Sequence, residues 1–579
     1  MTASITSGEK FKRAALFAAV LVFVGIVHHG VVEAPFHFDD YKSFVWNPSV
    51  RDTGNLLNYW TDPLLFSANP QKAMYRPVTM TSYLLNYMWR EYRPAVWHLT
   101  NLSLHLINVL LAMFLALRLL GKDSRAVAVG LIFGCHPVVV ESCAYVSARS
   151  GLLAASFGLG ALLVAGARPG LSGRFYKTAL SLLLFVSALA SKENAAALPG
   201  VALLMGIIAK DRQARNQWLA VASAWATLLV AYLAWRKWGL ALPSFPQRPD
   251  RPLGAHLLTQ SSIWVHYIRL LLWPWNISPV YGMRRISGLF EAPWAGMFPP
   301  WAALATLAVF AASATAAMKK HPAVFIGMGW FFLTLAPESV IPLNQLANDR
   351  RLYFPMIGLI VAAVSMGAVA IRDRPKVWRA LPIAVAGLFS LSAVSHVNLW
   401  KSNLALWKHS VKVSPLTSAT WINLGRHYVD IDILDKGLAA YRVAWMLERD
   451  NPNLMNNVGV VLIKMERTRQ AADLFSMLVE KFPEYHIGWH NLSSVLYSLG
   501  EYRNAEQASR RLIELVPDHP GGHLSLGNAL FAMNDLEGAR REYATALKLD
   551  PELQEARNNL RIVEKMITPD GSPLRSDSH

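Results

Sequence analysis

Repeated apolar runs, each long enough to form a helix across a membrane, constrain this chain more than any other feature. A membrane-crossing helix needs about 20 mostly apolar residues; 53% of the 579 residues are hydrophobic and only 16% are charged. The sequence therefore predicts an all-α, polytopic membrane domain of about 11 transmembrane helices. We expect these helices near residues 14–32, 98–119, 126–142, 151–167, 176–190, 194–209, 217–235, 299–318, 322–337, 351–371 and 380–397. The first run lacks a small-residue cleavage site, so we expect a retained anchor and not a signal peptide.

Basic residues between the runs predict how the chain is threaded through the membrane. Cytoplasmic loops carry an excess of Lys and Arg, and Lys10, Lys12 and Arg13 before the first run place the N-terminus in the cytoplasm. Later basic loops contain Lys122 and Arg125; Arg168, Arg174 and Lys177; Lys210, Arg212 and Arg215; Lys319 and Lys320; and Arg372, Arg374, Lys376 and Arg379. The alternation holds if residues 236–298 stay outside, with the interrupted apolar run 257–275 as an interfacial or re-entrant helix. Eleven crossings then place everything after residue 398 outside the cytoplasm.

Residues 415–567 show an internal period of 34 residues. Large residues recur at this spacing, at Trp421, Met455, Trp489, His523 and Arg557. A Leu or Val follows three positions later, and Ala and Pro positions recur further along. This pattern is typical of tetratricopeptide repeats, whose helix hairpins stack because none can bury its apolar face alone. We expect an α-solenoid of about four repeats plus a capping helix at 415–567, a polypeptide partner, and a disordered tail at 568–579.

Charge and cysteine content exclude other classes. Residues 398–579 carry 21 Lys and Arg against 22 Asp and Glu, so the whole basic excess of +18 lies in the apolar part. A nucleic-acid binder would concentrate charge on a soluble surface. The two cysteines, Cys135 and Cys143, indicate buried thiols and no disulfide framework. We find no nucleotide-binding loop and no His or Cys spacing for a structural metal, which favours a membrane-borne donor of any activated group.

Polar residues gather at the outer ends of the helices in this topology. They are Asp39 and Asp40; His136, Glu141 and Arg149; Lys192 and Glu193; and Glu338, Asp349, Arg350 and Arg351. Charges at such depth are costly and indicate function by default. Four motifs distant in sequence would thus share one face of the membrane, which makes that face a candidate active site.

Each motif also has a purely structural interpretation. Asp39 and Asp40 could mark the membrane interface, or one of them could deprotonate an acceptor hydroxyl as a general base. Lys192 and Glu193 could form an ion pair within a helix hairpin, or Lys192 could hold a phosphate.

Two further motifs have the same ambiguity. Arg350 and Arg351 begin a crossing from outside, against the charge rule, which suggests an anionic partner such as a lipid phosphate. His136 could form a turn with Pro137 and Glu141 could cap a helix, or both could belong to the site.

Several short motifs, in their order and spacing, resemble those of the transmembrane and tetratricopeptide repeat-containing O-mannosyltransferases. These enzymes belong to the C-type glycosyltransferases that use polyprenyl-phosphate sugars. The motifs are Phe38-Asp39-Asp40 with Asn47-Pro48-Ser49-Val50-Arg51, Tyr75-Arg76-Pro77-Val78-Thr79, His98-Leu99-Thr100-Asn101, His136-Pro137-Val138 with Glu141-Ser142 and Arg149-Ser150, Ser191-Lys192-Glu193-Asn194, Arg350-Arg351-Leu352-Tyr353-Phe354-Pro355, and the repeats.

The resemblance implies a C-type glycosyltransferase fold that moves a sugar, mannose or another hexose, from a polyprenyl phosphate to a Ser or Thr hydroxyl of a protein. It implies an inverting attack, with Asp40 or Asp39 as the base; we prefer Asp40. The remaining expected site residues are Lys192, Arg350, Arg351 and Arg149 for the donor phosphate, and His136, Glu141, Glu193 and Arg76 for the sugar or acceptor. No cofactor is certain, and a divalent metal is left open because some C-type enzymes use one.

We therefore expect a membrane glycosyltransferase domain at 1–400, with outer loops at 33–97 and 236–298, in a bacterial inner membrane or the endoplasmic reticulum. One alternative is a non-enzymatic, membrane-anchored tetratricopeptide scaffold, which leaves the outer-face charges unexplained. Another is a transporter, which should have charges near the midplane and repeated halves.

Overall fold

The structure, a computed structural model, describes residues 6–69, 74–167, 174–240, 252–281, 288–291, 297–341 and 345–567. The chain divides into two compact units, Met1–Ser414 and Pro415–His579. Every regular element within the described ranges is a helix, which confirms the all-α prediction. Arg168 of one basic loop, parts of the two outer loops and the tail at 568–579 lie outside the described residues.

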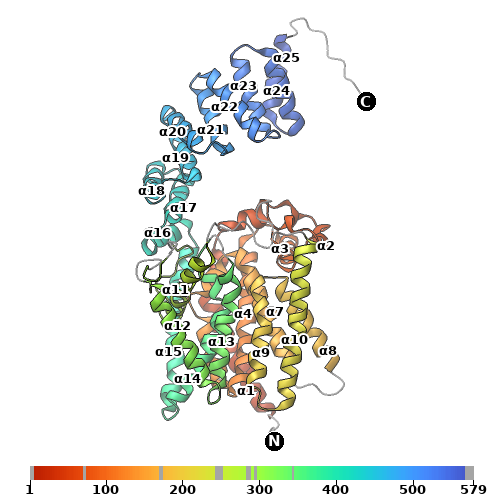
Figure 1. Cartoon of the computed structure of the whole chain (residues 1–579), viewed down its shortest axis with the longest axis vertical. Helices are drawn as coiled ribbons and strands as arrows, with labels where there is room; N and C mark the ends of the chain where they lie inside the picture. The colour runs from red at the N-terminus through yellow and green to blue at the C-terminus, as the bar shows by residue number, and fades with distance from the viewer. Residues whose placement is uncertain are drawn as a thin grey trace. The chain divides into compact units, whose positions relative to one another are not determined.

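The first unit has a helix at each of the eleven predicted apolar runs, and its longest helices run roughly parallel (Figure 1). They are α1 (Ser7–His28), α4 (Pro94–Leu120), α5 (Asp123–Gly134), α7 (Arg149–Ala165), α8 (Arg174–Leu189), α9 (Leu198–Ile208), α10 (Arg212–Ala234), α12 (Pro300–Ala317), α13 (Pro322–Val340), α14 (Pro355–Ala370) and α15 (Pro375–Trp400). Among the described residues, seven helical segments are long and apolar enough to cross a membrane, and α8, α9 and α14 contribute shorter apolar helices. The chain is therefore a membrane protein.

The predicted crossing at 126–142 is interrupted. Helix α5 ends at Gly134, and α6 (Val139–Ala144) begins after His136 and Pro137. A proline disfavours helical geometry in the residue before it, which accounts for the break. The interruption turns Glu141 onto a short separate helix.

Proline and glycine fix other details of the unit. Proline opens α4, α12, α13, α14 and α15, where its missing N–H costs nothing. Helices α13 and α14 approach closely at Gly327 and Gly358, since a methyl group on either would overlap the carbonyl oxygen of the other. Small residues allow such close packing of apolar helices.

The polar loops between the long helices contain short helices of their own. The first described loop holds η1 (His29–Glu33), η2 (Tyr41–Val45), η3 (Pro48–Arg51), α2 (Asn55–Asn58), η4 (Pro63–Phe66) and α3 (Pro77–Arg90). Helix α11 (Leu253–Leu272) packs against α12 and α13. It is not among the seven candidate spans, and its interfacial placement stays a prediction.

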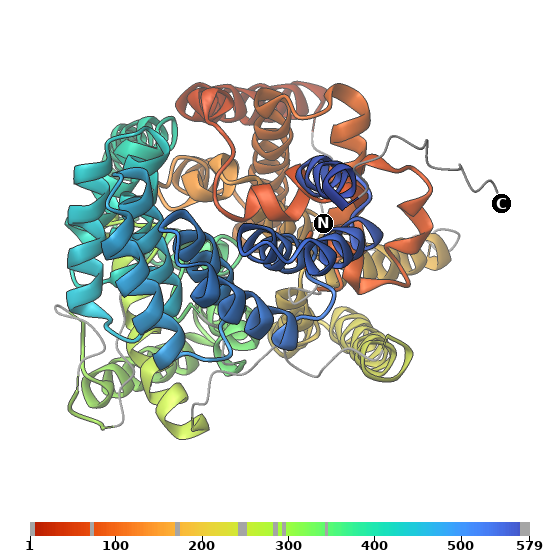
Figure 2. The same ribbon diagram turned by 90° about the horizontal axis from the view of Figure 1, so that it is seen from above.

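The second unit is a row of helix hairpins that follow one another along the chain (Figure 2). The helices are α17 (Ser418–Asp430), α18 (Leu434–Leu447), α19 (Pro452–Lys464), α20 (Thr468–Lys481), α21 (His486–Ser498), α22 (Tyr502–Leu515), α23 (Pro520–Ala532), α24 (Leu536–Leu549) and α25 (Gln554–Ile567). The first helix of each hairpin begins 34 residues after the previous one, and α25 is the capping helix. The predicted α-solenoid is confirmed.

The 34-residue period also determines which residues pack between the two helices of each hairpin. A methyl group on Gly425 or Gly527 would lie 2.6 Å from the ring of Tyr441 or Tyr543, so these glycines make room for an aromatic ring of the second helix. In the third repeat both positions change together, and Ser493 hydrogen-bonds Ser509 at 2.6 Å. The small positions of the motif are therefore steric requirements of the hairpin.

Candidate active site

The two aspartates lie in the loop between η1 and η2, and the residue before them has an unusual backbone. Phe38 has a φ of 44°, a left-handed conformation that is rare for a bulky residue. Such strain persists only where the surrounding structure enforces it, and it is common at functional sites. The loop is therefore held in place by its neighbours.

Asp40 is fully buried and accepts hydrogen bonds from the chain around it. Its Oδ2 accepts from the backbone N–H of His37 at 3.0 Å, and its Oδ1 accepts from the N–H and hydroxyl of Ser147 at 2.8 and 2.6 Å. Burial raises the pKa of Asp40 to about 7, although these donors oppose the shift. Asp40 thus ties the loop to the turn before α7.

Asp39 faces a different environment, which is partly open. The Tyr145 hydroxyl donates to its Oδ2 at 3.1 Å. The guanidinium carbon of Arg350 lies 5.0 Å from the centre of the Tyr145 ring, and the charges of Arg350 and Asp39 interact. Asp39, and not the sequence-preferred Asp40, is therefore the carboxylate beside the basic residues.

Arg350 links this loop to Glu141 of α6. Its Nη1 lies 3.4 Å from Glu141 Oε1. Burial raises the pKa of Glu141, with the charge of Arg350 opposing that rise. The buried Asp349 accepts hydrogen bonds from the Tyr281 hydroxyl at 2.8 and 2.9 Å, and burial raises its pKa as well.

A second group of ion pairs brings together residues from two of the predicted motifs. Lys192 Nζ lies 2.6 Å from Glu338 Oε1, and Arg351 Nε lies 3.2 Å from Glu338 Oε2. Arg351 also donates to the backbone carbonyls of Gln345 and Leu346. Burial lowers the pKa of Lys192, which Glu338 partly offsets.

A third group is centred on Glu193. Arg76 Nη2 lies 2.9 Å from Glu193 Oε2, and Arg236 Nη1 lies 3.5 Å from Glu193 Oε1. Arg76 also interacts electrostatically with Glu338, which connects this group to the previous one. Helices distant in sequence therefore supply one continuous network.

The ion pairs of the network join five cations to three carboxylates. Arg76, Lys192, Arg236, Arg350 and Arg351 face three glutamates, Glu141, Glu193 and Glu338, with Asp39 beside Arg350. All five cationic side chains are at least partly buried. A partly desolvated site with surplus positive charge is suited to a phosphate.

Arg149 and His136 do not join the basic network. The fully buried Arg149 donates to the side chains of Asn101 and Asn86 and to the carbonyls of Ser82 and Trp97. These four bonds use most of the five N–H groups of a guanidinium, so we no longer expect Arg149 to contact a phosphate.

His136 is also engaged with the chain itself. Its Nδ1 accepts from the N–H of Val138 at 3.2 Å, and its Nε2 lies 3.2 Å from the Leu271 carbonyl oxygen. The ring packs on Phe389. We therefore assign His136 to the turn after α5 and not to sugar binding.

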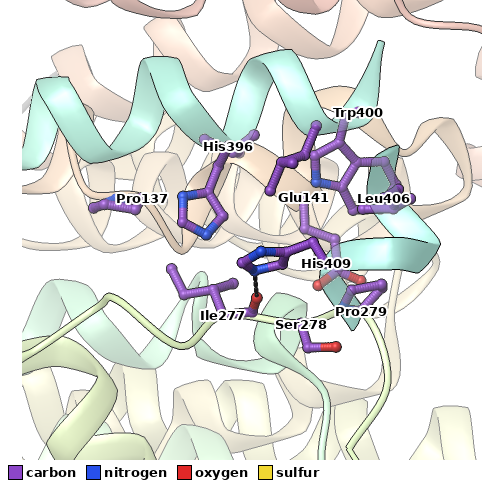
Figure 3. A pocket seen from close by; sticks show the side chains of 11 residues that line it. Pro137, Glu141, Ile277, Ser278, Pro279, His396, Trp400, Leu406 and His409 are labelled. Carbon is purple, nitrogen blue, oxygen red and sulfur yellow. Dashed lines mark hydrogen bonds between the residues drawn. The ribbon is translucent and has the colours of Figure 1, made fainter. Parts of the chain in front are cut away.

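A small pocket lies behind Glu141, between α6, α15, α16 (Asn403–Val413) and the segment 277–279 (Figure 3). Glu141 Oε2 and His396 Nε2 are buried there without a hydrogen-bond partner. His409, across the pocket, hydrogen-bonds the Ile277 carbonyl. Within the described residues, no three His, Cys, Asp or Glu side chains are arranged to hold a metal ion. The use of a divalent metal in the reaction is neither supported nor excluded by this finding.

Three site residues were not selected from the sequence. Nothing in the sequence distinguishes Tyr145 from the other aromatic residues of the chain. Arg236 lies in the short helix η9 (Trp235–Gly239) just after α10, where a basic residue is ordinary for the end of a membrane helix. Glu338 was recognised as an outer-face charge but given no role; its pairing with two cations is visible only in three dimensions.

The repeat array matches known family models. Residues 488–519 and 520–553 each match a tetratricopeptide repeat model. The crystal structure of YrrB, a tetratricopeptide repeat protein with an unusual peptide-binding site, is similar to part of this chain. The match covers 34% of this chain and 97% of the YrrB chain, at 19% identity and a TM-score of 0.26. A MamA structure from Desulfovibrio magneticus RS-1 covers 27% of this chain and 97% of its own, at 16% identity and a TM-score of 0.24.

Curated relatives match over more than two thirds of the chain. Mouse protein O-mannosyl-transferase TMTC4 is 24% identical over 461 residues, which cover 69% of this chain and 62% of the relative. Human protein O-mannosyl-transferase TMTC3 is 23% identical over 495 residues, 78% of this chain and 53% of the relative. The chain thus spans between half and two thirds of the length of these relatives. With the membrane helices and the repeats, these similarities confirm the resemblance seen in the sequence: the chain is a relative of the transmembrane and tetratricopeptide repeat-containing protein O-mannosyl-transferases.

Proposed function

We propose that this chain is a glycosyltransferase that moves a hexose, such as mannose, from a polyprenyl-phosphate donor to a Ser or Thr hydroxyl of a protein. The observation that carries the proposal is the network of five cations, of which Arg350 lies beside Asp39. Such a network suits a lipid phosphate. The relatives are named protein O-mannosyl-transferases, which supports the transfer of mannose to a protein.

In the proposed reaction, Asp39 is the general base. As the acceptor oxygen forms a bond to the anomeric carbon, its proton passes to the Asp39 carboxylate. The bond from that carbon to the phosphate oxygen breaks on the opposite face, so the configuration inverts. The leaving group is a polyprenyl phosphate, whose growing negative charge favours contact with cations.

Different cations suit different parts of this step. Arg350 lies nearest to Asp39 through Tyr145 and is the candidate for the leaving phosphate oxygen. Lys192 and Arg351 share Glu338, while Arg76 and Arg236 share Glu193. We propose that Lys192 completes the phosphate site, that Arg351 holds Glu338 beside it, and that Arg76 and Glu193 position the sugar.

The repeats are proposed to bind the polypeptide acceptor, since tetratricopeptide arrays present a surface for peptides. The proposed reaction takes place at the extracytoplasmic or lumenal face, on the side of the repeat unit. The alternative, a scaffold without catalysis, predicts neither a strained aspartate loop nor five cations around three carboxylates.

The test is sugar transfer by the purified full chain in lipid vesicles. The donor is a radiolabelled polyprenyl-phosphate mannose, and the acceptor is a set of Ser- and Thr-containing peptides. Asp39→Asn keeps the size of the side chain but cannot accept the proton, so turnover should fall by about 10²–10⁴-fold.

Asp52→Asn is the matched control. Asp52 is an exposed carboxylate of the same loop, and its Oδ1 accepts from the Gly54 N–H at 2.8 Å, a bond that an amide oxygen retains. Its turnover should be unchanged. Transfer by Asp39→Asn at the parental rate would refute the assignment of Asp39; a parental protein that transfers no sugar from any lipid-linked donor favours the scaffold.

A further inference from the structure

The aspartate loop is fastened to the corner between α15 and α16. Trp400 is the last residue of α15, and Asn403 is the first of α16. The His37 ring spans the two helices: its Nε2 lies 2.9 Å from the Trp400 carbonyl oxygen, and its Nδ1 lies 2.7 Å from Asn403 Oδ1. A single buried ring thus joins the loop to both sides of the corner.

The strained residue is held by the same corner. The Phe38 ring lies 4.9 Å from the ring of Trp407 and 6.1 Å from that of Trp400, both in edge contacts. The Phe38 ring also meets the ring of Tyr145 at 5.6 Å. Edge contacts of this kind contribute beyond their buried area.

These contacts offset the cost of the backbone at Phe38. A left-handed conformation is unfavourable for a non-glycine residue, because its Cβ crowds the following carbonyl oxygen, so the free loop would favour another conformation. Such a change would rotate the next residue, Asp39, away from the Tyr145 hydroxyl that donates to its Oδ2 at 3.1 Å. The orientation of Asp39 therefore depends on side chains that do not touch it.

We infer that Trp400, Asn403 and Trp407 are positioning residues that hold the strained loop so that Asp39 faces the basic network. The inference rests on the proposed role of Asp39 and adds a set of residues more than 360 positions away in the sequence. We call this set the corner clamp. Misplacement of a catalytic group by about 1 Å can cost 10²-fold in rate, so loosening the clamp should act on turnover.

The test uses three substitutions in α16 of the full chain. Trp407→Ala removes the ring that meets Phe38, Trp407→Phe keeps an aromatic ring, and Lys408→Ala changes an exposed neighbour. Trp407→Ala should lower kcat by about 10- to 100-fold, with the KM of donor and acceptor changed by no more than about twofold. Trp407→Phe should restore most of the rate, and Lys408→Ala should leave it unchanged.

A second measurement separates the clamp from the proposed function. In hydrogen exchange, the peptide that covers residues 34–46 includes the Asp40 amide, which donates to the His37 carbonyl at 2.8 Å. Trp407→Ala should speed exchange in this peptide, and Lys408→Ala should not. If the parental chain transfers no sugar, the exchange result alone shows whether the corner clamp holds the loop. Parental exchange and parental kcat in Trp407→Ala would overturn the inference.

Discussion

At the residue scale, adjacent carboxylates have separate tasks. The sequence places Asp39 and Asp40 together at one membrane face, but it cannot rank them because the difference is burial. Asp40 satisfies two backbone N–H groups and a hydroxyl, while Asp39 meets Tyr145 and Arg350. Partners more than 100 residues away determine which aspartate is buried, and no local sequence pattern predicts those partners.

The pH dependence of stability should report on Asp40. Burial raises its pKa from 3.8 to about 7, so the folded chain keeps a proton that the unfolded chain releases between these values. The stability from this group is fully present below about pH 4 and is lost as the pH rises through about 7. The melting temperature of the parental chain, compared with that of Asp40→Asn, should therefore fall over this range. A difference between the two that is flat from pH 4 to 8 would contradict the raised pKa.

The two adjacent arginines should also have different roles. Arg350 faces Tyr145 and Asp39, whereas Arg351 is tied to Glu338 and two carbonyls. Loss of a charge-assisted contact costs roughly 1.5–3 kcal/mol, or about 10- to 150-fold in affinity. Arg350→Ala should raise the apparent Kd for the lipid-linked sugar by this factor, whereas Arg351→Ala should lower the melting temperature with a smaller effect on that Kd. Unchanged donor affinity in Arg350→Ala would assign that residue to structure.

At the scale of the elements, the repeats were the most predictable part of the chain. Each helix hairpin follows from a 34-residue sequence period, because the small and large positions that define the motif are the packing contacts themselves. The break between α5 and α6 was harder to predict: the apolar run continues through Pro137, and hydropathy alone does not register a change of backbone direction. The apolar pattern of α11 also does not show whether this helix crosses the membrane or lies at its surface.

A glycine of the second repeat tests this packing argument. A methyl group on Gly459 would overlap the ring of Phe475, so Gly459→Ala should destabilise the array by about 1–3 kcal/mol. Ser493→Ala is the matched control, because the third repeat has no ring at this position and loses one hydrogen bond, about 1 kcal/mol at most. Hydrogen exchange across residues 452–481 measures the effect in the full chain. Slower exchange in Gly459→Ala, as for Gly→Ala in an open helix, would contradict the steric account.

At the scale of the whole molecule, the fold class and the membrane character followed from apolar runs, while the threading is inferred from loop charges alone. The alternation of basic loops predicts that the repeat unit is extracytoplasmic. A cysteine at Ser576, probed with a membrane-impermeant thiol reagent from the extracytoplasmic side of sealed membranes, should be labelled. The native Cys135 and Cys143 are both fully buried, so they should give little background. Labelling only after the membrane is opened would show that the number of crossings is even.

The site brings together residues from all over the first unit, and this explains what the sequence could and could not predict about it. Lys192, Arg350 and Asp39 were found because charges at helix ends are costly. Arg149 was included by the same rule, but its charge is satisfied internally by two asparagines and two carbonyls. A costly charge is therefore a reason to look for a partner, and only the three-dimensional arrangement shows whether the chain already supplies it.

The most direct measurement of the central claim is a structure of the Asp39→Asn chain with a bound polyprenyl-phosphate sugar. The phosphate should lie against Arg350 and Lys192, with the anomeric carbon of the sugar facing residue 39 and the lipid chain leading into the bilayer. A phosphate bound away from the five cations, or a sugar that faces away from residue 39, would contradict the proposed roles of Asp39 and Arg350.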